Sequence, residues 1–421
     1  MKKSVKIRKI IFEILYEIYQ KNSSFDESFV NFTSSLKLNE QEKSMVYNIT
    51  LNSLRKRFYI ANILNDFLKK KTSIKIKILL ISAITQILYL DFKTYAVTNE
   101  TVEVAKIKKL NPGLVNSLLK NLCKNLLSIN KEKIDFDSVP YWFSKRLKQN
   151  KLSIKTIIKN TSVEPSLHLV FKNKKLLNCF SEPHIKTTDK SAFVLEKKKI
   201  DKYENYSNGH WWIQDFASML PIFLSNELHS KKTIDMCAAP GGKAFQLLSS
   251  GSEVFLNDIN SKRINLLNEN LNRLNFTKKL SNINALDLPE NQNYEVVVLD
   301  SPCTGIGTIR RNPEILFKKK APDIEKLSKI QENLINKASQ LLKKNGVLIY
   351  MVCSFFVEET KEIKKKFLEK NKNFSQLKFR LKNKHNLNNF IDKDGDYMCI
   401  PTKYKNYMID GFYAVKFQKN D

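Results

Sequence analysis

Two cysteines stand where a parallel sheet would bring them together. Cys303 lies in the segment Asp300-Ser301-Pro302-Cys303, which follows one β-rich run, and Cys353 directly follows a later one. In open α/β sheets, ligands bind at the carboxyl ends of the strands, so both thiols and the Asp300 carboxylate are expected to converge on one cleft. A lone cysteine is usually an inert small apolar side chain, but two at such positions beside a carboxylate indicate thiol chemistry.

A glycine-rich segment, DMCAAPGGK from Asp235 to Lys243, follows the first strand of the same region. Its small residues would let the backbone approach a ligand and present N–H groups at the start of a helix. The segment contains neither GxGxxG nor the GKS or GKT of a phosphate-binding loop, which excludes an ordinary dinucleotide or P-loop site. A plain turn is the alternative for this segment taken alone.

Asp258 ends the second strand of the region, in the segment Leu256-Asn257-Asp258-Ile259. A carboxylate at this place can accept hydrogen bonds from both hydroxyls of a ribose. The alternative is that Asp258 caps the helix that follows. Its position at a strand end favours the ligand.

The elements that must carry these residues alternate between strand and helix from residue 206 to 421. β-rich runs occur at Thr233–Asp235, Glu253–Leu256, Glu295–Leu299 and Val347–Val352, and helical stretches at Lys262–Leu274 and Asp323–Leu342. Such alternation predicts a mostly parallel, Rossmann-like α/β sheet with helices on both faces. A final run, Phe412–Phe417, is expected to add an antiparallel edge strand.

The two preceding regions differ from this one. Residues 1–135 are predicted to form an all-helical bundle, because apolar residues recur at helical spacing, for example in Ile7–Ile18 and Ile74–Leu88. Residues 136–205 contain shorter segments separated by prolines, and the alternation Leu167-Leu169-Phe171 is typical of a strand. A small α+β connecting module is expected there.

The charge balance indicates an anionic partner. The 421 residues include 72 Lys+Arg and 42 Asp+Glu, which gives a net charge of +30. Nucleic acid is the partner that such a surplus favours. The many Lys, Asn and Ile residues would also result from an AT-rich genome, but that bias does not explain why acidic residues are so much fewer.

The remaining composition points to a reducing, cytoplasmic environment. The six cysteines are scattered and form no C-x-x-C pair, which argues against a secreted disulfide framework. Glu13 and Glu17 interrupt the apolar N-terminal run, and Ile78–Leu90 is too short to span a bilayer, so no membrane association is expected. The five histidines show no metal-ligand spacing, and no metal is predicted.

Taken together, the motifs DMCAAPGGK, LNDIN, LDSPCTGIGTIRRNPEI and YMVCS resemble those of the S-adenosylmethionine-dependent RNA cytosine-C5 methyltransferases. Within that family the chain is most similar to the RsmB (Sun/Fmu) branch, which methylates a cytosine in 16S, the small-subunit, ribosomal RNA. The segments from Tyr95 to Lys106 and from Gly113 to Asn116 resemble the NusB-like RNA-binding bundle of that branch. The resemblance covers nearly the whole chain.

The resemblance implies S-adenosylmethionine as cofactor. Its binding residues would be Asp258 on the ribose, Asp287 near the adenine, Asp300, and the glycine-rich loop of Cys237, Ala238, Ala239, Pro240, Gly241, Gly242 and Lys243. For Asp287, an ordinary loop carboxylate is an equally good interpretation.

The resemblance also implies a division of labour between the cysteines. Cytosine C5 is a poor nucleophile, and a thiolate that adds to C6 makes C5 enamine-like. The family pattern assigns that attack to Cys353, product release to Cys303 and contact with the cytosine N3/N4 edge to Asp300. An unperturbed thiol is only a few per cent ionised at neutral pH, so the site must activate it.

Arg310 and Arg311 form an adjacent pair beside the PCTG loop in a chain that otherwise prefers lysine. Guanidinium geometry suits phosphate, so both are expected to bind RNA, whereas a solvated pair is the alternative.

The chain departs from the family pattern at Ser301, Ile306, Ala244 and Val352. Val352 replaces the usual threonine before the nucleophile. This change removes a hydroxyl next to Cys353 and puts the orientation of that cysteine in question. Two rival functions therefore stay open: methylation of tRNA or another rRNA site, and an inactive RNA-binding assembly factor. The pattern identifies neither the target cytosine nor whether naked rRNA or an early assembly intermediate is the substrate, and it indicates no obligate protein partner.

Overall fold

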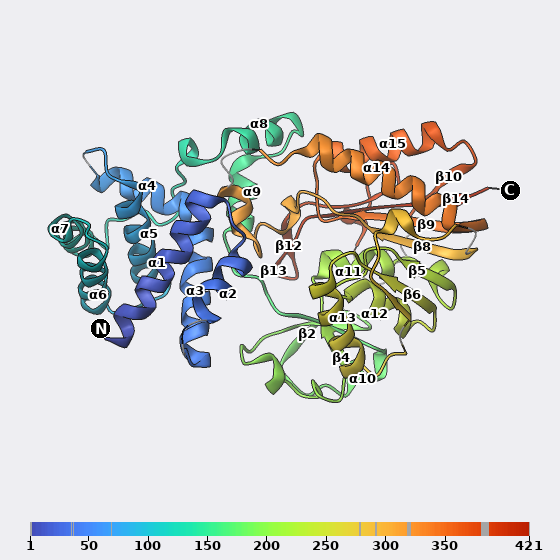
Figure 1. Ribbon diagram of the computed structural model, residues 1–421, viewed down its shortest axis with the longest axis horizontal. Coiled ribbons are helices and arrows are strands. Elements are labelled where there is room, and N and C mark those ends of the chain that lie inside the picture. Colours follow the sequence, from blue (N-terminus) through green and yellow to red (C-terminus); the bar gives the residue numbers. More distant parts are fainter. Residues whose placement is uncertain are drawn as a thin grey trace. The chain divides into compact units, whose positions relative to one another are not determined.

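The computed structural model describes residues 2–34, 36, 38–68, 70–277, 279–290, 293–317, 321–379 and 387–420. The chain divides into two units (Figure 1). The first, called the helical unit below, comprises residues 1–164 and 309–321, and the second, the sheet unit, comprises residues 165–308 and 322–421.

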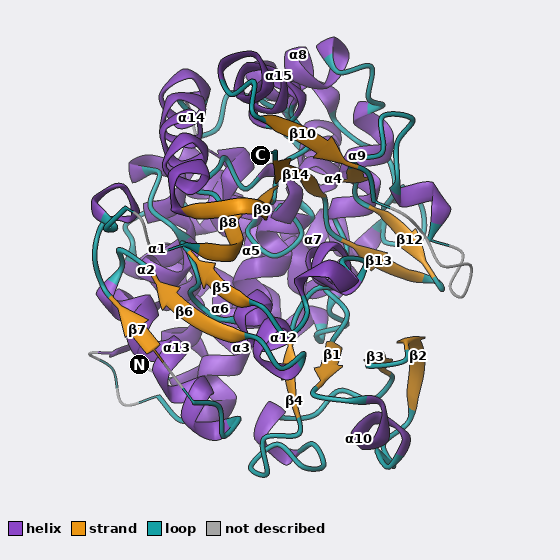
Figure 2. Cartoon of the chain, turned by 90° about the vertical axis from the view of Figure 1, so that its right-hand side faces the viewer, coloured by secondary structure: helices purple, strands orange, loops and turns teal. Residues whose placement is uncertain are grey.

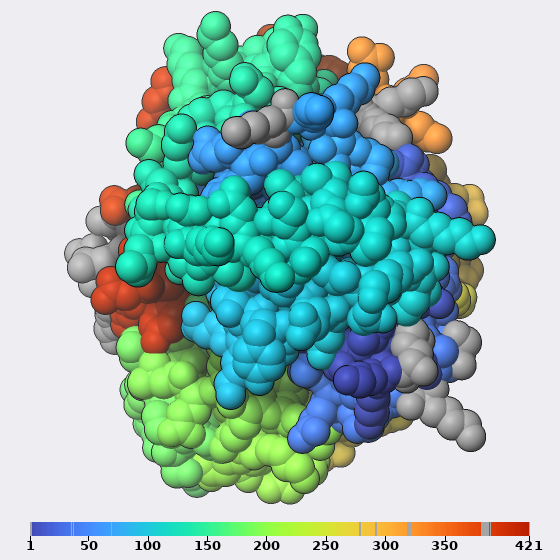
Figure 3. Space-filling view, turned by 90° about the vertical axis from the view of Figure 1, so that its left-hand side faces the viewer, coloured from blue at the N-terminus to red at the C-terminus, as the bar shows by residue number. Residues whose placement is uncertain are grey.

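The helical unit confirms the predicted all-helical N-terminal region. Its helices are α1 (Lys3–Lys21), α2 (Phe25–Ser34), α3 (Glu40–Arg55), α4 (Arg57–Phe67), α5 (Ile74–Tyr89), α6 (Thr94–Ile107), α7 (Pro112–Lys124), α8 (Tyr141–Gln149) and α9 (Ile154–Thr161), with 3-10 turns η1 (Phe136–Ser138) and η6 (Pro313–Phe317). Helices α6 and α7, cyan in Figure 3, form much of the surface shown there.

Local signals set where these helices begin. Asn39 caps α3 by accepting from the Glu42 N–H, while the Glu42 carboxylate accepts from the Asn39 N–H, which is a complete capping box. Ser73 caps α5 by accepting from the Ile76 N–H, and nearly every residue of α5 from Ile76 to Leu88 is buried. Helix α5 therefore runs through the core of the bundle and packs against α1, α3 and α6.

Residues 309–321 belong to the helical unit although they follow the PCTG loop in sequence. Phe317 is buried in the bundle core, edge-on to Tyr19 with ring centroids 4.7 Å apart. The Arg57 guanidinium lies 4.1 Å from the centroid of the Phe317 ring and donates to the Leu316 carbonyl. Arg55 Nε donates to the Arg310 carbonyl at 2.8 Å. The bundle thus anchors this segment by both ring contacts and hydrogen bonds.

This division differs from the three regions predicted from the sequence. Residues 136–205 do not stand apart: 136–164, with α8 and α9, cluster with the bundle, and the rest cluster with the sheet unit. The predicted boundary at 206 also misses the return of residues 309–321 to the bundle. Both differences arise from long-range packing, which leaves no local signature in the sequence.

The sheet unit begins with a small antiparallel sheet, ordered β2-β3-β1-β4. Its strands are β1 (His168–Phe171), β2 (His184–Thr188), β3 (Ser191–Val194) and β4 (Trp211–Ile213), accompanied by α10 (Lys174–Asn178) and η2 (Ile200–Lys202). The alternation that predicted a strand at Leu167–Phe171 is thereby confirmed.

The main sheet has the order β10-β14-β9-β8-β5-β6-β7 (Figure 2). Its strands are β5 (Lys232–Asp235), β6 (Glu253–Asn257), β7 (Lys279–Ser281), β8 (Tyr294–Asp300), β9 (Leu342–Val352), β10 (Phe374–Leu377), β11 (Tyr397–Cys399) and β14 (Phe412–Lys419). Strands β5 to β9 are parallel neighbours, and β14 pairs antiparallel with β9. A separate hairpin joins β12 (Thr402–Tyr404) to β13 (Tyr407–Ile409).

Two hydrophobic cores flank the main sheet. Its helices are α11 (Phe216–Phe223), α12 (Gly242–Ser249), α13 (Ser261–Arg273), α14 (Ile324–Leu341) and α15 (Lys361–Lys370), with 3-10 turns η3 (Asn226–Leu228), η4 (Ala285–Asp287), η5 (Ile306–Thr308), η7 (Val357–Glu359) and η8 (Asn388–Phe390). Val296 and Val298 of β8 pack with α11, α12 and α13, whereas Val297 and Leu299 pack with α14 and α15. The strand period of two thus serves both faces, as the predicted Rossmann-like fold requires.

Strand β14 is antiparallel as predicted, but the expectation that it forms an edge is wrong. It pairs with β9 on one side and with β10 and β11 on the other. The two strands that cover it, β10 and β11, are short, and their pairing with β14 is a long-range contact that no local sequence pattern predicts.

None of the described helices has both the length and the apolar character needed to cross a bilayer.

Candidate active site

The two cysteines lie together because their strands are neighbours. Strands β8 and β9 are parallel, and Asp300 at the end of β8 pairs with Met351 near the end of β9. The chain beyond each strand therefore emerges on the same edge of the sheet. Cys303 Sγ and Cys353 Sγ are 3.3 Å apart, and both residues are partly exposed.

Backbone hydrogen bonds connect the two cysteine-bearing segments. The Ser301 N–H donates to the Met351 carbonyl, and the Gly307 N–H donates to the Cys353 carbonyl, each at 2.9 Å. The Gly307 carbonyl accepts in turn from the Gly411 N–H at 2.8 Å. A Cβ on Gly307 would lie 2.0 Å from the Gly411 carbonyl oxygen, so only glycine allows this approach.

The environment of Cys303 keeps its thiol protonated. Its hydrogen bond with Cys353 and its burial both raise the pKa of Cys303 well above the ordinary value. The negative charge of Glu359 acts in the same direction. Because a thiol with a raised pKa retains its proton at neutral pH, Cys303 is suited to donate a hydrogen bond rather than to attack.

Lys243 and Asp300 form the ion pair of the site. Lys243 Nζ lies 2.6 Å from Asp300 Oδ2, and the lysine side chain is largely buried. Lys243 lies in the first turn of α12, and Asp300 is the last residue of β8. This pair therefore connects the glycine-rich loop to the segment that carries Cys303.

Asp258 holds the glycine-rich loop in place. One of its carboxylate oxygens accepts from the Ala239 N–H at 3.1 Å and the other from the Asn260 N–H at 2.9 Å. The cap of α13 is Asn260, so the alternative that Asp258 caps this helix is wrong. The Gly241 φ of +119° is a conformation that glycine adopts without strain, and it starts α12 directly after the loop.

The other predicted cofactor residues lie along the same edge. Cys237 follows β5, and burial raises the pKa of its thiol. Asp287 is exposed at the end of the η4 turn, which follows β7. The carboxyl ends of β5, β6 and β8 and the turn after β7 thus each contribute a predicted binding residue.

Asp235, which the sequence placed only at the start of the loop motif, is a buried carboxyl group. The residue is 1% exposed, and neither carboxylate oxygen has a hydrogen-bond partner among the described residues. Burial and the charges of Asp300 and Asp258 together raise its pKa to about 7, against the opposing effect of Lys243. An unpaired buried carboxyl group beside a ligand loop is suited to a cationic ligand.

We predict that Asp235 makes the sheet unit less stable as the pH rises from about 4 to 7. In that window the unfolded chain, with its ordinary pKa of 3.8, has released the proton that the folded protein still holds near its pKa of about 7. The free energy of unfolding should therefore fall by up to ~1.4 kcal/mol per pH unit, and stay level above pH 7 as far as this group is concerned.

Urea unfolding of wild type and Asp235→Asn at pH 5, 6, 7 and 8 measures this effect. The variant should gain stability relative to wild type up to pH 7 and then no more. The same change at exposed Asp201 is the control and should leave the pH profile unaltered. A constant difference between Asp235→Asn and wild type across the range would contradict the prediction.

Arg310 and Arg311 are not placed alike. Arg310 is 2% exposed within the helical unit, and both arginines have interaction partners. Its burial contradicts the expectation that its guanidinium binds RNA. Arg311 is half-exposed, and its contact with RNA stays a prediction. The arginine pair in a lysine-rich chain suggested phosphate binding, but packing in the helical unit buries Arg310.

Val352, the main departure from the family pattern, does not disturb the cysteine pair. It is fully buried in the core formed with α14 and α15, whereas Cys353 packs against the core on the other face. The alternation of β9 therefore directs the two side chains apart. A threonine hydroxyl at position 352 would lie in that core rather than beside the Cys353 sulfur.

Sequence reasoning missed Glu359. It is completely buried and hydrogen-bonded to the residues that follow each cysteine, Thr304 and Ser354. The only local signal was its place six residues after Cys353.

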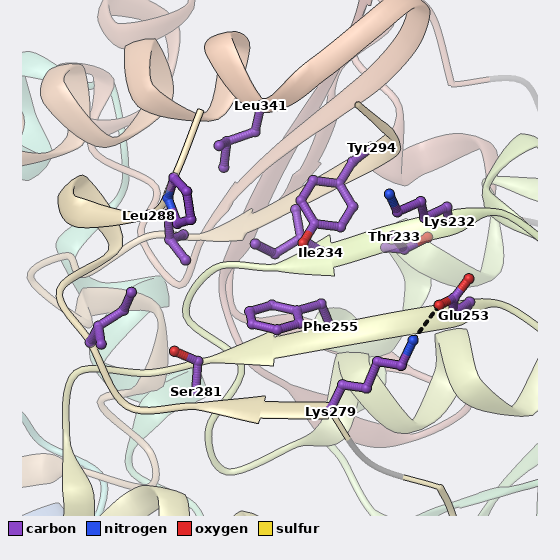
Figure 4. Close-up of a pocket in the computed structure, with 12 residues that line it drawn as sticks. Lys232, Thr233, Ile234, Glu253, Phe255, Lys279, Ser281, Leu288, Tyr294 and Leu341 are labelled. Atoms are coloured by element: carbon purple, nitrogen blue, oxygen red, sulfur yellow. Dashed lines mark hydrogen bonds and ion pairs between the residues drawn. The ribbon is translucent and has the colours of Figure 1, made fainter. Parts of the chain in front are cut away.

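A separate cavity of about 500 Å³ lies over β5, β6 and β7 (Figure 4). The connection from β7 to β8 contains the η4 turn but no α-helix among its described residues, and Ile234 and Phe255 line the cavity there. The Glu253–Lys279 ion pair lies at the first residues of β6 and β7, at the strand ends opposite Asp235 and Asp258. The described residues contain no group of three or more His, Cys, Asp or Glu arranged to hold a metal.

Two family models match separate parts of the chain. Residues 222–418 match the model described as 16S rRNA methyltransferase RsmB/F, and residues 5–124 match the NusB family. Two curated relatives are similar over their full lengths. The probable ribosomal RNA small subunit methyltransferase B of Bacillus subtilis is 25% identical, with 99% of both chains covered. The ribosomal RNA small subunit methyltransferase B of Proteus mirabilis is 24% identical, with 100% of both covered.

Solved structures show the same fold. The crystal structure of PH0851 has a TM-score of 0.71 at 18% identity and covers 100% of this chain and 99% of its own. The structure of NSun6 from Pyrococcus horikoshii with SFG has a TM-score of 0.54 at 18% identity, covering 66% of this chain and 97% of its own.

Proposed function

Because residues 222–418 belong to the RsmB/F family of 16S rRNA methyltransferases and residues 5–124 to the NusB family, we propose that this protein methylates C5 of one specific cytosine in 16S rRNA. The methyl donor is S-adenosyl-L-methionine, and the reaction passes through a covalent bond between Cys353 Sγ and cytosine C6. The observation that carries the proposal is the pair of sulfurs 3.3 Å apart at the ends of adjacent parallel strands. The protein acts in the cytoplasm, on naked rRNA or an early assembly intermediate.

The residues present fit the cofactor. Its amino group and sulfonium are cationic, and the edge that would receive them carries Asp258, Asp287 and Asp300 beside the unpaired carboxyl group of Asp235. Residues Cys237–Lys243 would hold it with Asp258 on the ribose. When bound, the cofactor supplies an electrophilic methyl group. The net charge of +30 suits the RNA substrate.

The chemistry follows from the two thiols. Cys353 Sγ, as thiolate, adds to C6 of the cytosine, and the electron pair displaced from the C5–C6 bond makes C5 nucleophilic. Asp300, held by Lys243, contacts the N3/N4 edge and orients the base. After methyl transfer, the C5 proton passes to water, and the electron pair of the C5–H bond re-forms the C5–C6 double bond as the C6–S bond breaks and Cys353 leaves as thiolate. The Cys303 thiol, which keeps its proton, then donates a hydrogen bond to the departing Cys353 thiolate.

Incubation of the purified protein with unmodified 16S rRNA and labelled S-adenosylmethionine, followed by bisulfite sequencing, tests the proposal. We expect one modified cytosine. Assembly intermediates and naked rRNA should be compared in parallel, with tRNA and large-subunit rRNA as the competing substrates. Methylation confined to a competing RNA would overturn the assignment to 16S rRNA. No methylation of any of these RNAs would favour an RNA-binding assembly factor instead.

A further inference from the structure

The Glu359 carboxylate accepts hydrogen bonds from both of the segments that carry the cysteines. Its Oε1 accepts from the Thr304 N–H at 2.8 Å and from Gln331 Nε2 at 3.1 Å. Its Oε2 accepts from Thr304 Oγ1 at 2.6 Å and from Ser354 Oγ at 2.5 Å. Thr304 and Ser354 are the residues directly after Cys303 and Cys353. One side chain therefore fixes the distance between the two segments.

The bonding capacity of the group is used completely. An ionised carboxylate has about four acceptor sites and no donor, and four donors surround this one. Glu359 and Ser354 are fully buried, so each bond is made without competing water and is of the strong, charge-assisted kind. Loss of the carboxylate would leave buried donors unpaired on both segments.

Neighbouring groups hold Glu359 itself in place. Tyr350 of β9 donates its hydroxyl to the Glu359 carbonyl at 2.8 Å. Gln331 of α14, which donates to the carboxylate, also donates to the Pro302 carbonyl at 2.9 Å. The carboxylate thus belongs to a buried network that joins α14, the end of β9 and the Pro302-Cys303 peptide.

We propose that Glu359 is a positioning residue for the two-cysteine reaction, holding the Cys303 and Cys353 segments so that the two sulfurs remain in contact. The role of Glu359 in turnover rests on the proposed function. Its effect on the distance between the two sulfurs does not, and can be tested separately. The negative charge of Glu359 also helps to keep the Cys303 proton in place.

Oxidative cross-linking measures the contact without RNA or cofactor. Diamide removes two electrons and two protons from a pair of thiols, which become a disulfide while diamide is reduced to its hydrazine. The wild-type protein should form the Cys303–Cys353 disulfide, identified by peptide mass spectrometry. Glu359→Ala should form it at least about 10-fold more slowly, because disulfide formation demands narrow geometry.

Turnover provides the second measurement. In Glu359→Ala, kcat should fall about 100-fold, the size of effect expected when reacting groups shift by about 1 Å. The affinity for S-adenosylmethionine should stay within about twofold. Glu359→Gln, whose amide can satisfy the same hydroxyls after they rotate, should recover much of the cross-linking rate. Glu362→Ala, which removes an exposed glutamate on α15, is the matched control and should behave as wild type.

Two milder variants keep the test decisive if Glu359→Ala does not fold. Thr304→Val and Ser354→Ala each remove one hydroxyl donor and leave the carboxylate with its other partners. Each should slow the cross-link by a smaller factor, with folding checked by circular dichroism. Cross-linking at the wild-type rate in folded Glu359→Ala, or in both milder variants, would overturn the positioning role. That outcome is independent of whether 16S rRNA is the substrate.

Discussion

Replacing Cys353 by alanine is expected to abolish methyl transfer, lowering the rate by at least about 10³-fold. The reason is that no other thiol described at the site can replace it as nucleophile: Cys303 keeps its proton, since its hydrogen bond and its burial raise its pKa. Removal of a covalent nucleophile leaves only binding and orientation to assist the reaction. Incorporation of labelled methyl groups into 16S rRNA under single-turnover conditions measures the loss.

The same substitution at Cys179, an exposed cysteine beyond α10, is the control and should leave the rate unchanged. Cofactor affinity should also be retained in Cys353→Ala, because the predicted binding residues lie directly after β5 and β6, in η4 and at the end of β8 rather than at the end of β9. A Cys353→Ala protein that still methylates at a tenth of the wild-type rate or more would contradict the covalent mechanism.

Cys303→Ala is expected to trap the protein on its RNA. Cys353 can still add to C6 and methyl transfer can follow, but the departing thiolate loses the hydrogen-bond donor that lies 3.3 Å away. Release should therefore slow by about 100-fold, within the range for loss of one positioned hydrogen-bond donor. A covalent RNA–protein adduct should accumulate and be visible as a slow-migrating band on a denaturing gel.

The double variant, Cys303→Ala with Cys353→Ala, identifies the bond. It should form no adduct, because the attacking thiol is gone. An adduct in Cys353→Ala but not in Cys303→Ala would mean that the two cysteines exchange roles. Equal loss of turnover without an adduct in either variant would reject the division of labour.

Local patterns were sufficient for most elements of the sheet unit. The runs at Thr233–Asp235 and Glu295–Leu299 lie within the observed strands β5 and β8, and the stretch Lys262–Leu274 matches α13 to within one residue at each end. These elements carry strong periodicity, and the placement of both cysteines after strands was correct for the same reason. The polar strand β7 had no such pattern and was missed.

Pairing between distant segments was decided by the tertiary structure. Strand β14 became an interior strand because β10 and β11 cover it. Residues 309–321 pack with the bundle because Arg55 and Arg57 donate hydrogen bonds to backbone carbonyls of this segment and Phe317 is buried in the bundle core. The same packing buried Arg310, which its sequence context had suggested for RNA binding.

The sequence by itself determined which chemical groups are present and which strand ends carry them. It therefore predicted the cysteine pair, the glycine-rich loop and the carboxylates of the site. Only the tertiary structure decided that Lys243 pairs with Asp300, that Asp235 lies buried without a partner, and that Glu359 joins the two cysteine segments. The physical reason is that strand and helix periodicity are local properties, whereas burial and hydrogen bonding depend on residues that meet only after the chain has folded.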